Sequence, residues 1–376
     1  MTATPSLVLA RVDEELRALW TAPSTAGEPP KSRACTMNLV VVGAGPDFAT
    51  QCIPVIDRVV AHVPARAILV GLDPDGPDDL EASVAAVCAP EPGGAPSVCS
   101  ERVTLVARGA LCTRLWSCVD AICATDVPMT LVWLARVHSD DLAFIPLARG
   151  ASRIVLDSAL SSIASLSRVV RYTRAISERE RPGLGDLAWT RLASWQELCA
   201  RMFDPPRLRP LIQHVNRIRI VQAAPDDVLG PEAALLLGWM ATRLGWKTAS
   251  LAGNLRLVRP DGGYVQIQLR PQLQAGGTGG RGRERLIGIE IAASSGELTM
   301  QGEIASDHSA EADAATWRVQ VSEGGEAQRL EQHTYLRGVE PAQVLERTLH
   351  RPPHDDALAD AVLWADELRG EELAYT

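Results

Sequence analysis

Long apolar runs are missing from this sequence of 376 residues. No stretch approaches the roughly 18 consecutive apolar residues that cross a bilayer. The first residues, Met1–Pro5, also lack the basic cluster and the following apolar segment that open a secretory signal. We therefore expect a chain that does not span a membrane and that stays in the cytoplasm.

A surplus of positive charge is also missing. The chain has 37 Lys and Arg against 46 Asp and Glu, which gives a formal net charge of -9 and a pI near 5.4. This balance repels nucleic-acid phosphates and anionic lipid unless a basic patch is set apart from the rest, and no basic patch extends over a whole domain. Neither a nucleic acid nor a membrane surface is expected as a partner.

Arginine is nevertheless concentrated in two stretches on either side of residues 177–183. They could form a positive seam that meets an acidic partner or a phosphorylated metabolite. Solvated helix faces explain the same pattern, because exposed charges usually contribute little. The two stretches are Arg168, Arg171, Arg174, Arg179 and Arg181, and Arg201, Arg207, Arg209, Arg217 and Arg219.

Paired cysteine spacings are absent as well. No Cys-x-x-Cys occurs, which excludes the common zinc and thioredoxin-like motifs. Most of the eight cysteines lie in apolar segments, and the sequence therefore predicts reduced, buried thiols and no metal site. The cysteines are at positions 35, 52, 88, 99, 112, 118, 123 and 199.

No complete catalytic set is present. The chain has no Gly-x-Ser-x-Gly elbow, and the adjacent residues Asp307-His308-Ser309 cannot face one another as a triad requires. Two prolines between His350 and His354 bar the helix that would place both on one face for a metal. Because nothing brings a nucleophile, a base and an orienting group together, we expect no enzymatic activity and no cofactor.

One turn deserves comparison with a nucleotide site. Gly43-Ala44-Gly45-Pro46 follows an apolar strand where a dinucleotide-binding fingerprint places its first two glycines. The third glycine position is Phe48, Pro46 has no N–H for a pyrophosphate, and the acid expected about 20 residues later is missing. A sharp strand-to-helix turn is favoured, and the alternative is an enzyme that binds a nucleotide or sugar phosphate at this carboxyl edge.

Residues 35–176 alternate short β-branched runs with helical patterns. Runs such as Leu39–Val42 are apolar on both faces, as parallel strands covered by helices on both sides must be. This predicts an open, mostly parallel α/β sheet with right-handed crossovers. The expected strands are Met37–Val42, Ala67–Leu72, Val103–Val106, Thr130–Leu134 and Arg153–Leu156, and the expected helices span 47–62, 78–88, 112–124, 140–148 and 159–176.

The pattern changes after the charged turn at 177–183. Alternating polarity, as in Tyr264–Leu269, predicts strands with one solvent-exposed face. The residues Asp261-Gly262-Gly263 predict a hairpin turn. An α+β domain with an antiparallel sheet follows, with two closing helices on that sheet, so the expected domains are 1–34 (a helix at 5–20 and a linker), 35–180 and 181–376. Expected strands are 215–222, 253–259, 263–270, 285–293, 297–304 and 315–321; expected helices are 190–202, 231–244, 340–350 and 355–369; a Gly-rich loop is expected at 276–282.

One segment carries a family resemblance. The stretch Gly185–Leu198 closely resembles the segment that opens the C-terminal part of the glucose-6-phosphate dehydrogenase assembly protein (OpcA) family, with Asp-Leu-x-Trp-x-Arg-Leu-x-x-Trp at 186–195. Further similar stretches are Asp126–Trp133, Ala151–Ser158 and Pro64–Ile68. The resemblance covers roughly residues 35–270 and fades in the last hundred.

The resemblance implies a non-catalytic protein that binds glucose-6-phosphate dehydrogenase, promotes its active oligomer and modulates its affinity for substrate in the oxidative pentose phosphate pathway. In cyanobacterial members this control is linked to thioredoxin through cysteines, some of which lie late in the sequence. The last cysteine of this chain is Cys199, so those late cysteines have no counterpart here. A structural scaffold for some other enzyme is a further alternative.

The shared segment is the predicted partner-binding site, through Asp186, Trp189, Arg191 and Trp195. Asp186 can cap a helix that starts near Leu187. The two tryptophans are six residues apart and so lie on different faces of it. One face could then meet a partner, since Trp and Arg supply many interface anchors, and the alternative is that both tryptophans are core residues.

Overall fold

The computed structural model describes residues 4–21, 31–89, 97–137, 142–160, 162–223, 229–251, 254–272, 285–307, 314–336 and 340–374. The chain forms two compact units. Unit 1 consists of Met1–Asp157, Tyr172–Gly185 and Glu340–His354, and unit 2 of Ser158–Arg171, Asp186–Val339 and Asp355–Thr376. Each unit is therefore discontinuous in sequence, whereas boundaries at 34/35 and 180/181 stay a prediction.

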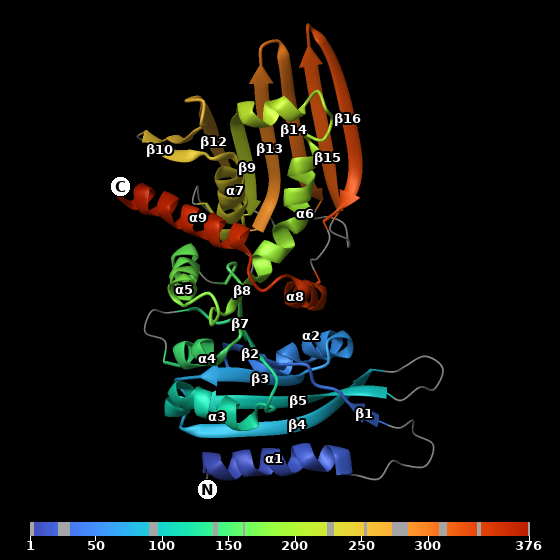
Figure 1. The fold of residues 1–376 in the computed structure, drawn as a ribbon, viewed down its shortest axis with the longest axis vertical. Helices are drawn as coiled ribbons and strands as arrows, with labels where there is room; N and C mark the ends of the chain where they lie inside the picture. Colours follow the sequence, from blue (N-terminus) through green and yellow to red (C-terminus); the bar gives the residue numbers. More distant parts are fainter. Residues whose placement is uncertain are drawn as a thin grey trace. The chain divides into compact units, whose positions relative to one another are not determined.

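Unit 1 is built on an eight-stranded sheet with the order β1-β5-β3-β2-β6-β7-β8, and β4 pairs with β5 (Figure 1). The pairs β1–β5, β5–β3, β3–β2, β2–β6 and β6–β7 are parallel, and β4–β5 is antiparallel. The predicted α/β sheet is confirmed. Its strands are β1 (Lys31–Arg33), β2 (Asn38–Ala44), β3 (Arg66–Asp73), β4 (Asp79–Ala89), β5 (Ser97–Arg108), β6 (Met129–Trp133), β7 (Arg153–Leu156) and β8 (Gly183–Asp186).

Helices cover this sheet because its central strands are apolar on both faces. The side chains of β2 from Leu39 to Val42 are fully buried, as expected for a parallel strand between helical layers. The helix α1 packs on β4, and α2 packs on β3 and β5. The helical segments are α1 (Pro5–Thr21), α2 (Phe48–His62), η2 (Gly109–Arg114), α3 (Leu115–Ile122), α4 (Phe144–Gly150) and α8 (Pro341–His350), while α5 (Ile163–Ala175) contributes residues to both units.

The segment 78–88, predicted as a helix, is a strand. It forms β4, which pairs continuously with β5 from Asp79 opposite Arg108 to Ala89 opposite Val98. Its many alanines favour a helix, but the segment forms a strand on which α1 packs and in which Leu80 is buried. Pairing with β5 overrides the local preference.

The helix α8 also differs from its prediction, since it does not dock on the second sheet. It belongs to unit 1 and packs against α2. Arg58 on α2 forms an ion pair with Glu340 at 3.0 Å, and His62 lies 3.5 Å from Glu346. The apolar face of α8 supplies the burial, through Val344 and Leu345.

Unit 2 is built on a second eight-stranded sheet with the order β10-β11-β12-β9-β13-β14-β15-β16. Neighbouring strands are antiparallel except for β12 and β9, which are parallel. The predicted antiparallel α+β part is confirmed. The strands are β9 (Val215–Ala223), β10 (Lys247–Leu251), β11 (Asn254–Val258), β12 (Tyr264–Pro271), β13 (Arg285–Ser295), β14 (Leu298–Asp307), β15 (Ala314–Glu323) and β16 (Glu326–Tyr335).

The predicted hairpin at Asp261–Gly263 joins β11 to β12, with Gly262 at φ +82°. Glycine suits this position because an L side chain is strained there. The Gly-rich stretch 276–282 and the residues His308 and Ser309 lie outside the described part of the chain.

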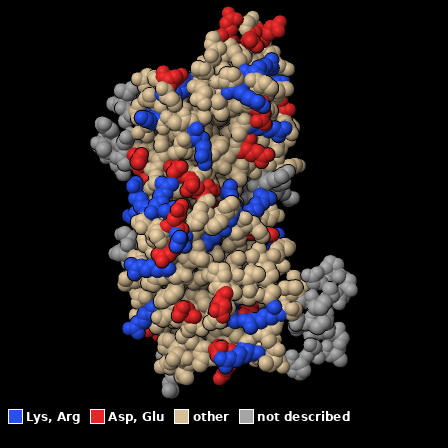
Figure 2. Space-filling view, viewed as in Figure 1, with Lys and Arg blue, Asp and Glu red and all other residues tan. Residues whose placement is uncertain are grey.

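One face of the second sheet forms the core of unit 2, and the other is polar. Isoleucines such as Ile220, Ile289 and Ile304 are buried, while Arg219 and Glu290 on the alternate positions are partly exposed. Figure 2 shows basic and acidic side chains interspersed over the visible surface. The helical segments of this unit are α6 (Leu187–Arg201), η3 (Arg209–His214), α7 (Pro231–Leu244) and α9 (Asp356–Ala374).

Candidate functional site

The carboxyl edge of the first sheet is where a ligand would be expected from topology. The strand β2 is central, the chain continues outward through β3 and β5, and then returns to β6 and β7 on the other side of β2. In open α/β sheets ligands bind at the carboxyl ends of strands where the order reverses in this way. The turn Gly43–Asp47 between β2 and α2 occupies that place.

Side chains and backbone fill this turn. A Cβ atom at Gly43 would overlap the ring of Phe48, which is only 5% exposed. A Cβ atom at Gly71, on the neighbouring strand β3, would lie 2.6 Å from the carbonyl oxygen of Gly45. The two glycines thus permit close packing of the turn on Phe48 and on β3.

The charges at the turn also oppose a diphosphate. Pro46 has no N–H, and Asp47 places a carboxylate at the N-terminus of α2, where the helix dipole would otherwise attract an anion. Asp73, at the end of β3, lies 3.4 Å from Arg108. Within the described residues of this turn, Pro46 and Asp47 thus disfavour a phosphate although the strand order is that of a nucleotide site.

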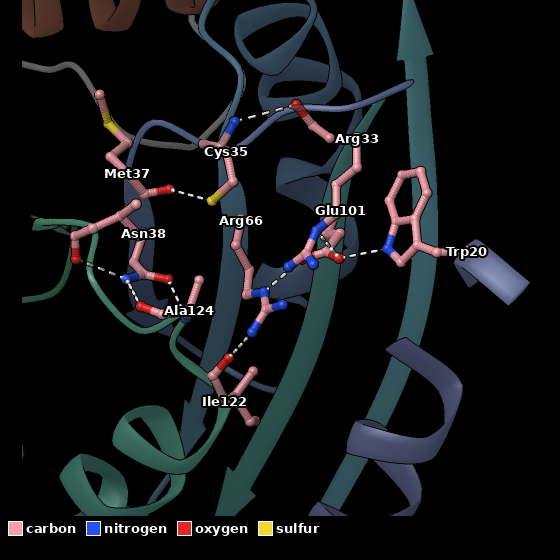
Figure 3. A network of polar contacts seen from close by, with 12 residues as sticks. Trp20, Arg33, Cys35, Met37, Asn38, Arg66, Glu101, Ile122 and Ala124 are labelled. Carbon is pink, nitrogen blue, oxygen red and sulfur yellow. Dashed lines mark hydrogen bonds and ion pairs between the residues drawn. The ribbon is translucent and has the colours of Figure 1, made fainter. Parts of the chain in front are cut away.

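A buried carboxylate joins four elements of unit 1 (Figure 3). Glu101 on β5 is 2% exposed and accepts hydrogen bonds from Trp20 Nε1 at 2.6 Å and Arg66 Nε at 2.6 Å. Arg33 Nε lies 2.9 Å away, and Arg66 also donates to the carbonyl of Ile122. Two arginines and an indole satisfy this carboxylate, which suits a structural role that ties α1 and β1 to the sheet.

The cysteines only partly follow the prediction of reduced thiols. Cys88 and Cys99 face each other across β4 and β5 and form a disulfide, so the prediction is wrong for this pair. Local spacing could not show it, because the register of the two strands brings these residues together. The described cysteines outside this disulfide are Cys35, Cys52, Cys112, Cys118, Cys123 and Cys199.

Burial makes several of these free thiols poor nucleophiles. It raises the pKa of Cys112, Cys118 and Cys199 above the ordinary value. Burial, helped by the charge of Asp120, raises the pKa of Cys123 to about 11. The thiolate is the reactive form, so these residues stay protonated near neutral pH. Within the described residues no three His, Cys, Asp or Glu side chains are grouped to hold a metal ion.

The segment 186–195 forms the start of α6 in unit 2. Asp186 is 1% exposed and is the N-cap of the helix, as predicted: Oδ1 accepts from the Trp189 backbone N–H at 2.8 Å. Its carboxylate also accepts from the backbone N–H and the hydroxyl of Ser158, at 2.7 and 3.0 Å. One carboxylate thus fixes the start of the helix and a second segment of the chain.

Both tryptophans of the segment are buried in unit 2. Trp189 is 3% exposed and donates a hydrogen bond from Nε1 to Asp355 at 2.8 Å, and Trp195 is 6% exposed. Helix α6 packs against α7 and β14, so its different faces meet the protein's own core. The burial fits the alternative that both tryptophans are core residues.

Arg191 is linked to α7 and the sheet through one acid. Its Nε lies 3.2 Å from Oε1 of Glu232, whose other oxygen accepts from the Leu286 backbone N–H at 3.1 Å. Glu232 is buried and sits in the first turn of α7. Sequence reasoning missed Glu232, Ser158 and Asp355; a lone acid at the start of the apolar segment 231–244 was the available signal for the first.

Many of the sequence's arginines are engaged with neighbours inside unit 2. Arg171 lies 3.5 Å from Asp366, and Arg219 lies 2.6 Å from Glu290. The guanidinium of Arg201 stands 5.6 Å from the ring centroid of Trp317.

Within the described residues no helix is long and apolar enough to cross a membrane.

Two family models match this chain in sequence order. Residues 57–171 match the N-terminal domain of the glucose-6-phosphate dehydrogenase subunit, and residues 182–362 match the C-terminal domain of the same subunit. The chain belongs to the OpcA family. The second match reaches residue 362, so family membership extends beyond the region in which the resemblance was visible from residues alone.

Curated relatives in this family are cyanobacterial. The chain is 28% identical over 197 residues to a protein of Nostoc punctiforme, and 29% identical over 198 residues to one of Synechococcus elongatus, both carrying the provisional name OxPP cycle protein OpcA. These matches cover 52% of this chain and 41% and 43% of the relatives. The matched region thus spans about two fifths of their length.

Solved structures resemble the chain only distantly. Glucose-6-phosphate 1-dehydrogenase from Mycobacterium avium has a TM-score of 0.47 at 10% identity, covering 89% of this chain and 92% of that one. KijD10, a 3-ketoreductase from Actinomadura kijaniata, has a TM-score of 0.45 at 10% identity, covering 89% and 97%.

Proposed function

We propose that this OpcA-family chain is a non-catalytic assembly factor and allosteric activator of glucose-6-phosphate dehydrogenase in the oxidative pentose phosphate pathway. The observation that carries the proposal is the match of both family models, each described as a domain of a glucose-6-phosphate dehydrogenase subunit. The turn Gly43–Phe48 supports it, because Pro46 has no N–H there and Asp47 places a carboxylate at the start of α2, which disfavours a phosphate.

The proposed mechanism is preferential binding to one state of the enzyme. A partner shifts an equilibrium only by the difference between its affinities for the two states. The chain would bind the active oligomer of the dehydrogenase more tightly than the inactive form, and so raise the fraction of competent enzyme at low substrate concentration. Equal affinity for both forms would contradict the mechanism.

We also propose that the segment around α6 contributes to the partner-binding surface. Asp186, Trp189, Arg191 and Trp195 would act by holding the helix in place, since the first, second and fourth are buried and Arg191 pairs with the buried Glu232. The exposed residue Glu197, on the same helix, would be available for direct contact. This separates residues that position the surface from residues that touch the partner.

The test is the activity of the dehydrogenase from the same organism, assayed at low glucose 6-phosphate and titrated with this chain. We expect saturable activation and co-elution of the two proteins. The variant Glu197→Arg should weaken the activation while keeping the fold, and Glu297→Arg, an equal charge change at another exposed position of unit 2, should not. Absence of both activation and co-elution would overturn the proposal.

The alternative of a nucleotide- or sugar-phosphate-binding enzyme rests on the strand order of the first sheet. It predicts saturable micromolar binding of a dinucleotide by the isolated chain. We expect no such binding in a fluorescence titration with reduced nicotinamide dinucleotide, because Pro46, Asp47 and Phe48 replace the donors and space that a pyrophosphate needs.

A further inference from the structure

Among the described residues, no strand pairs with the outer side of β16 in the second sheet. This strand ends the strand order, and its ten residues pair with β15 without interruption, from Glu326 opposite Glu323 to Tyr335 opposite Ala314. Nine of the ten positions are exposed, including Leu330 at 45% and Tyr335 at 68%. A long, regular, exposed edge is a template for pairing with another strand.

Several of the usual protections of an edge are missing from β16, although it does carry charged side chains. Proteins shorten edge strands, add Lys or Pro to them, or twist them away with a bulge. The opposite edge of the same sheet follows this rule, because β10 has five residues and starts with Lys247. In contrast β16 contains neither Pro nor Lys, and its register with β15 shows no shift. Length and regular pairing thus leave β16 better suited than β10 to pair with a further strand.

The charges of β16 are complementary to themselves. Around Leu330 the strand reads Arg329-Leu330-Glu331. In an antiparallel pair of two copies centred on Leu330, each Arg329 lies opposite Glu331 of the second copy, and the two leucines face each other. The two-fold axis repeats the Arg329–Glu331 contact on both sides of the single Leu330–Leu330 contact, as an isologous interface requires. Opposite charges and apolar pairs directly across strands stabilise such a pair.

A charged row on the polar face of the sheet would continue across this junction. Glu303 on β14 lies 2.6 Å from Arg318 on β15, which lies 3.1 Å from Glu331 on β16. These three residues are directly opposite one another in successive strands. Arg329 of a second copy would come next in the row, beside Glu331, so the alternation of signs is preserved.

We propose that β16 is a self-association edge, at which two copies of this chain pair antiparallel about Leu330 to join their second sheets into one continuous sheet. The inference concerns the chain alone and does not depend on which enzyme it binds. The partner is a second copy because the sequence of β16 matches itself in charge and in apolar contact.

The test is a charge reversal measured by sedimentation velocity and light scattering over the micromolar range, with the full chain. The parent chain should form a dimer that dissociates on dilution. Arg329→Glu and Glu331→Arg should each place like charges opposite each other twice and weaken the dimer by about tenfold. Arg243→Glu, an equal charge change on α7, should leave the dimer unchanged.

A mixture of the two variants gives the sharpest outcome. In equimolar mixture, the reversed position of each variant faces an opposite charge on the other at both contacts, so a heterodimer should form although neither variant dimerises well alone. A monomeric parent chain, a dimer insensitive to both reversals, or a mixture that stays monomeric would each overturn the proposal. Protection of β16 amides from exchange only when the dehydrogenase is added, with the chain itself monomeric, would also overturn it and assign the edge to the enzyme.

Discussion

At the scale of single residues, Asp186 makes more contacts than a helix cap needs. Replacement by Ala removes the cap of α6 and leaves the buried N–H and hydroxyl of Ser158 without this acceptor. A lost cap costs about 1 kcal/mol and a buried unpaired donor about 1–3 kcal/mol, so we expect Asp186→Ala to lower the free energy of unfolding by about 2–4 kcal/mol. Urea unfolding measures the change.

The control for this prediction lies on the same helix. Glu197 is exposed, and Glu197→Ala should change the free energy of unfolding by less than about 0.5 kcal/mol, as surface substitutions usually do. A loss under about 1 kcal/mol for Asp186→Ala would mean that a water or another group replaces the carboxylate, and the carboxylate would then not be the main tie between the two segments.

A second residue, Cys123, gives a prediction about pH. Burial raises its pKa to about 11, whereas an ordinary thiol ionises near 9. Between these values the unfolded chain has lost the proton and the folded chain still holds it, so the contribution of this group to stability falls as the pH rises from about 9 to about 11. Alkylation of Cys123 by iodoacetamide should be slow at pH 8 and rise steeply above pH 10.

Peptide mass spectrometry identifies the modified residue, and Cys123→Ser removes its signal. Denatured protein provides the reference rate of a free thiol at each pH. If the folded chain reacted at Cys123 as fast as denatured protein at pH 8, the local environment would not hold the thiol in its protonated form.

At the scale of elements, the helices α7 and α9 pack closely at Gly238. A Cβ atom there would lie 2.5 Å from the carbonyl oxygen of Ala361, which belongs to the backbone and cannot move alone. Gly238→Ala gains about 1 kcal/mol in helix propensity but forces the helices apart at a cost of about 1–3 kcal/mol. We expect a net loss of up to about 2 kcal/mol in urea unfolding.

The exposed position Ala200 on α6 serves as a control that measures the difference in helix propensity between Ala and Gly without a packing change. Ala200→Gly should cost about 1 kcal/mol, because no packing is involved. If Gly238→Ala instead stabilised unit 2 by a similar amount, the contact between α7 and α9 would have enough freedom to accept a methyl group.

Elements were predictable from sequence where the local pattern and the tertiary setting agree. The helix at 231–244 and the strand Arg153–Leu156 appear with the bounds expected, since Pro231 starts the helix, Gly245 ends it, and the short strand is fully buried. The segment 78–88 failed because alanine favours a helix locally while β5 supplies a partner that no local window contains. Strand β16 was missed because its exposed, charged residues lack the alternation that marks a half-buried strand.

The same distinction applies to the candidate site. The cap at Asp186 was predictable, because it lies within four residues of the helix it starts. Three partners lie 28 to 166 residues from the groups they bind: Ser158, Glu232 and Asp355. The local sequence does not predict these contacts. The predicted role of the segment in partner binding remains to be tested.

At the scale of the whole molecule, unit 1 depends on a segment from the far end of the chain. Residues 340–354 supply α8, whose Val344 and Leu345 are buried and whose acids pair with Arg58 and His62 on α2. We expect residues 31–180 alone to lose protection from hydrogen exchange at α2, relative to the full chain, because buried apolar area is lost.

Restoring the missing segment provides the matched control. Joining residues 340–354 to the end of residues 31–180 through a flexible linker should recover the protection of α2. The same fusion with Val344→Ser and Leu345→Ser should not, since the apolar face of α8 is then removed. Full protection of α2 in residues 31–180 would show that α8 is not needed for the stability of the first sheet.

The return of the chain to unit 1 also sets an order of events during synthesis. After Asp157 leaves the ribosome, roughly 200 further residues must be made before α8 is complete, which takes about 10–40 s at ~5–20 residues per second. During that time the apolar surface of α2 that packs on α8 in the folded chain remains exposed. A chaperone that binds nascent chains would find its target there, and the first sheet would mature only after the second had been translated.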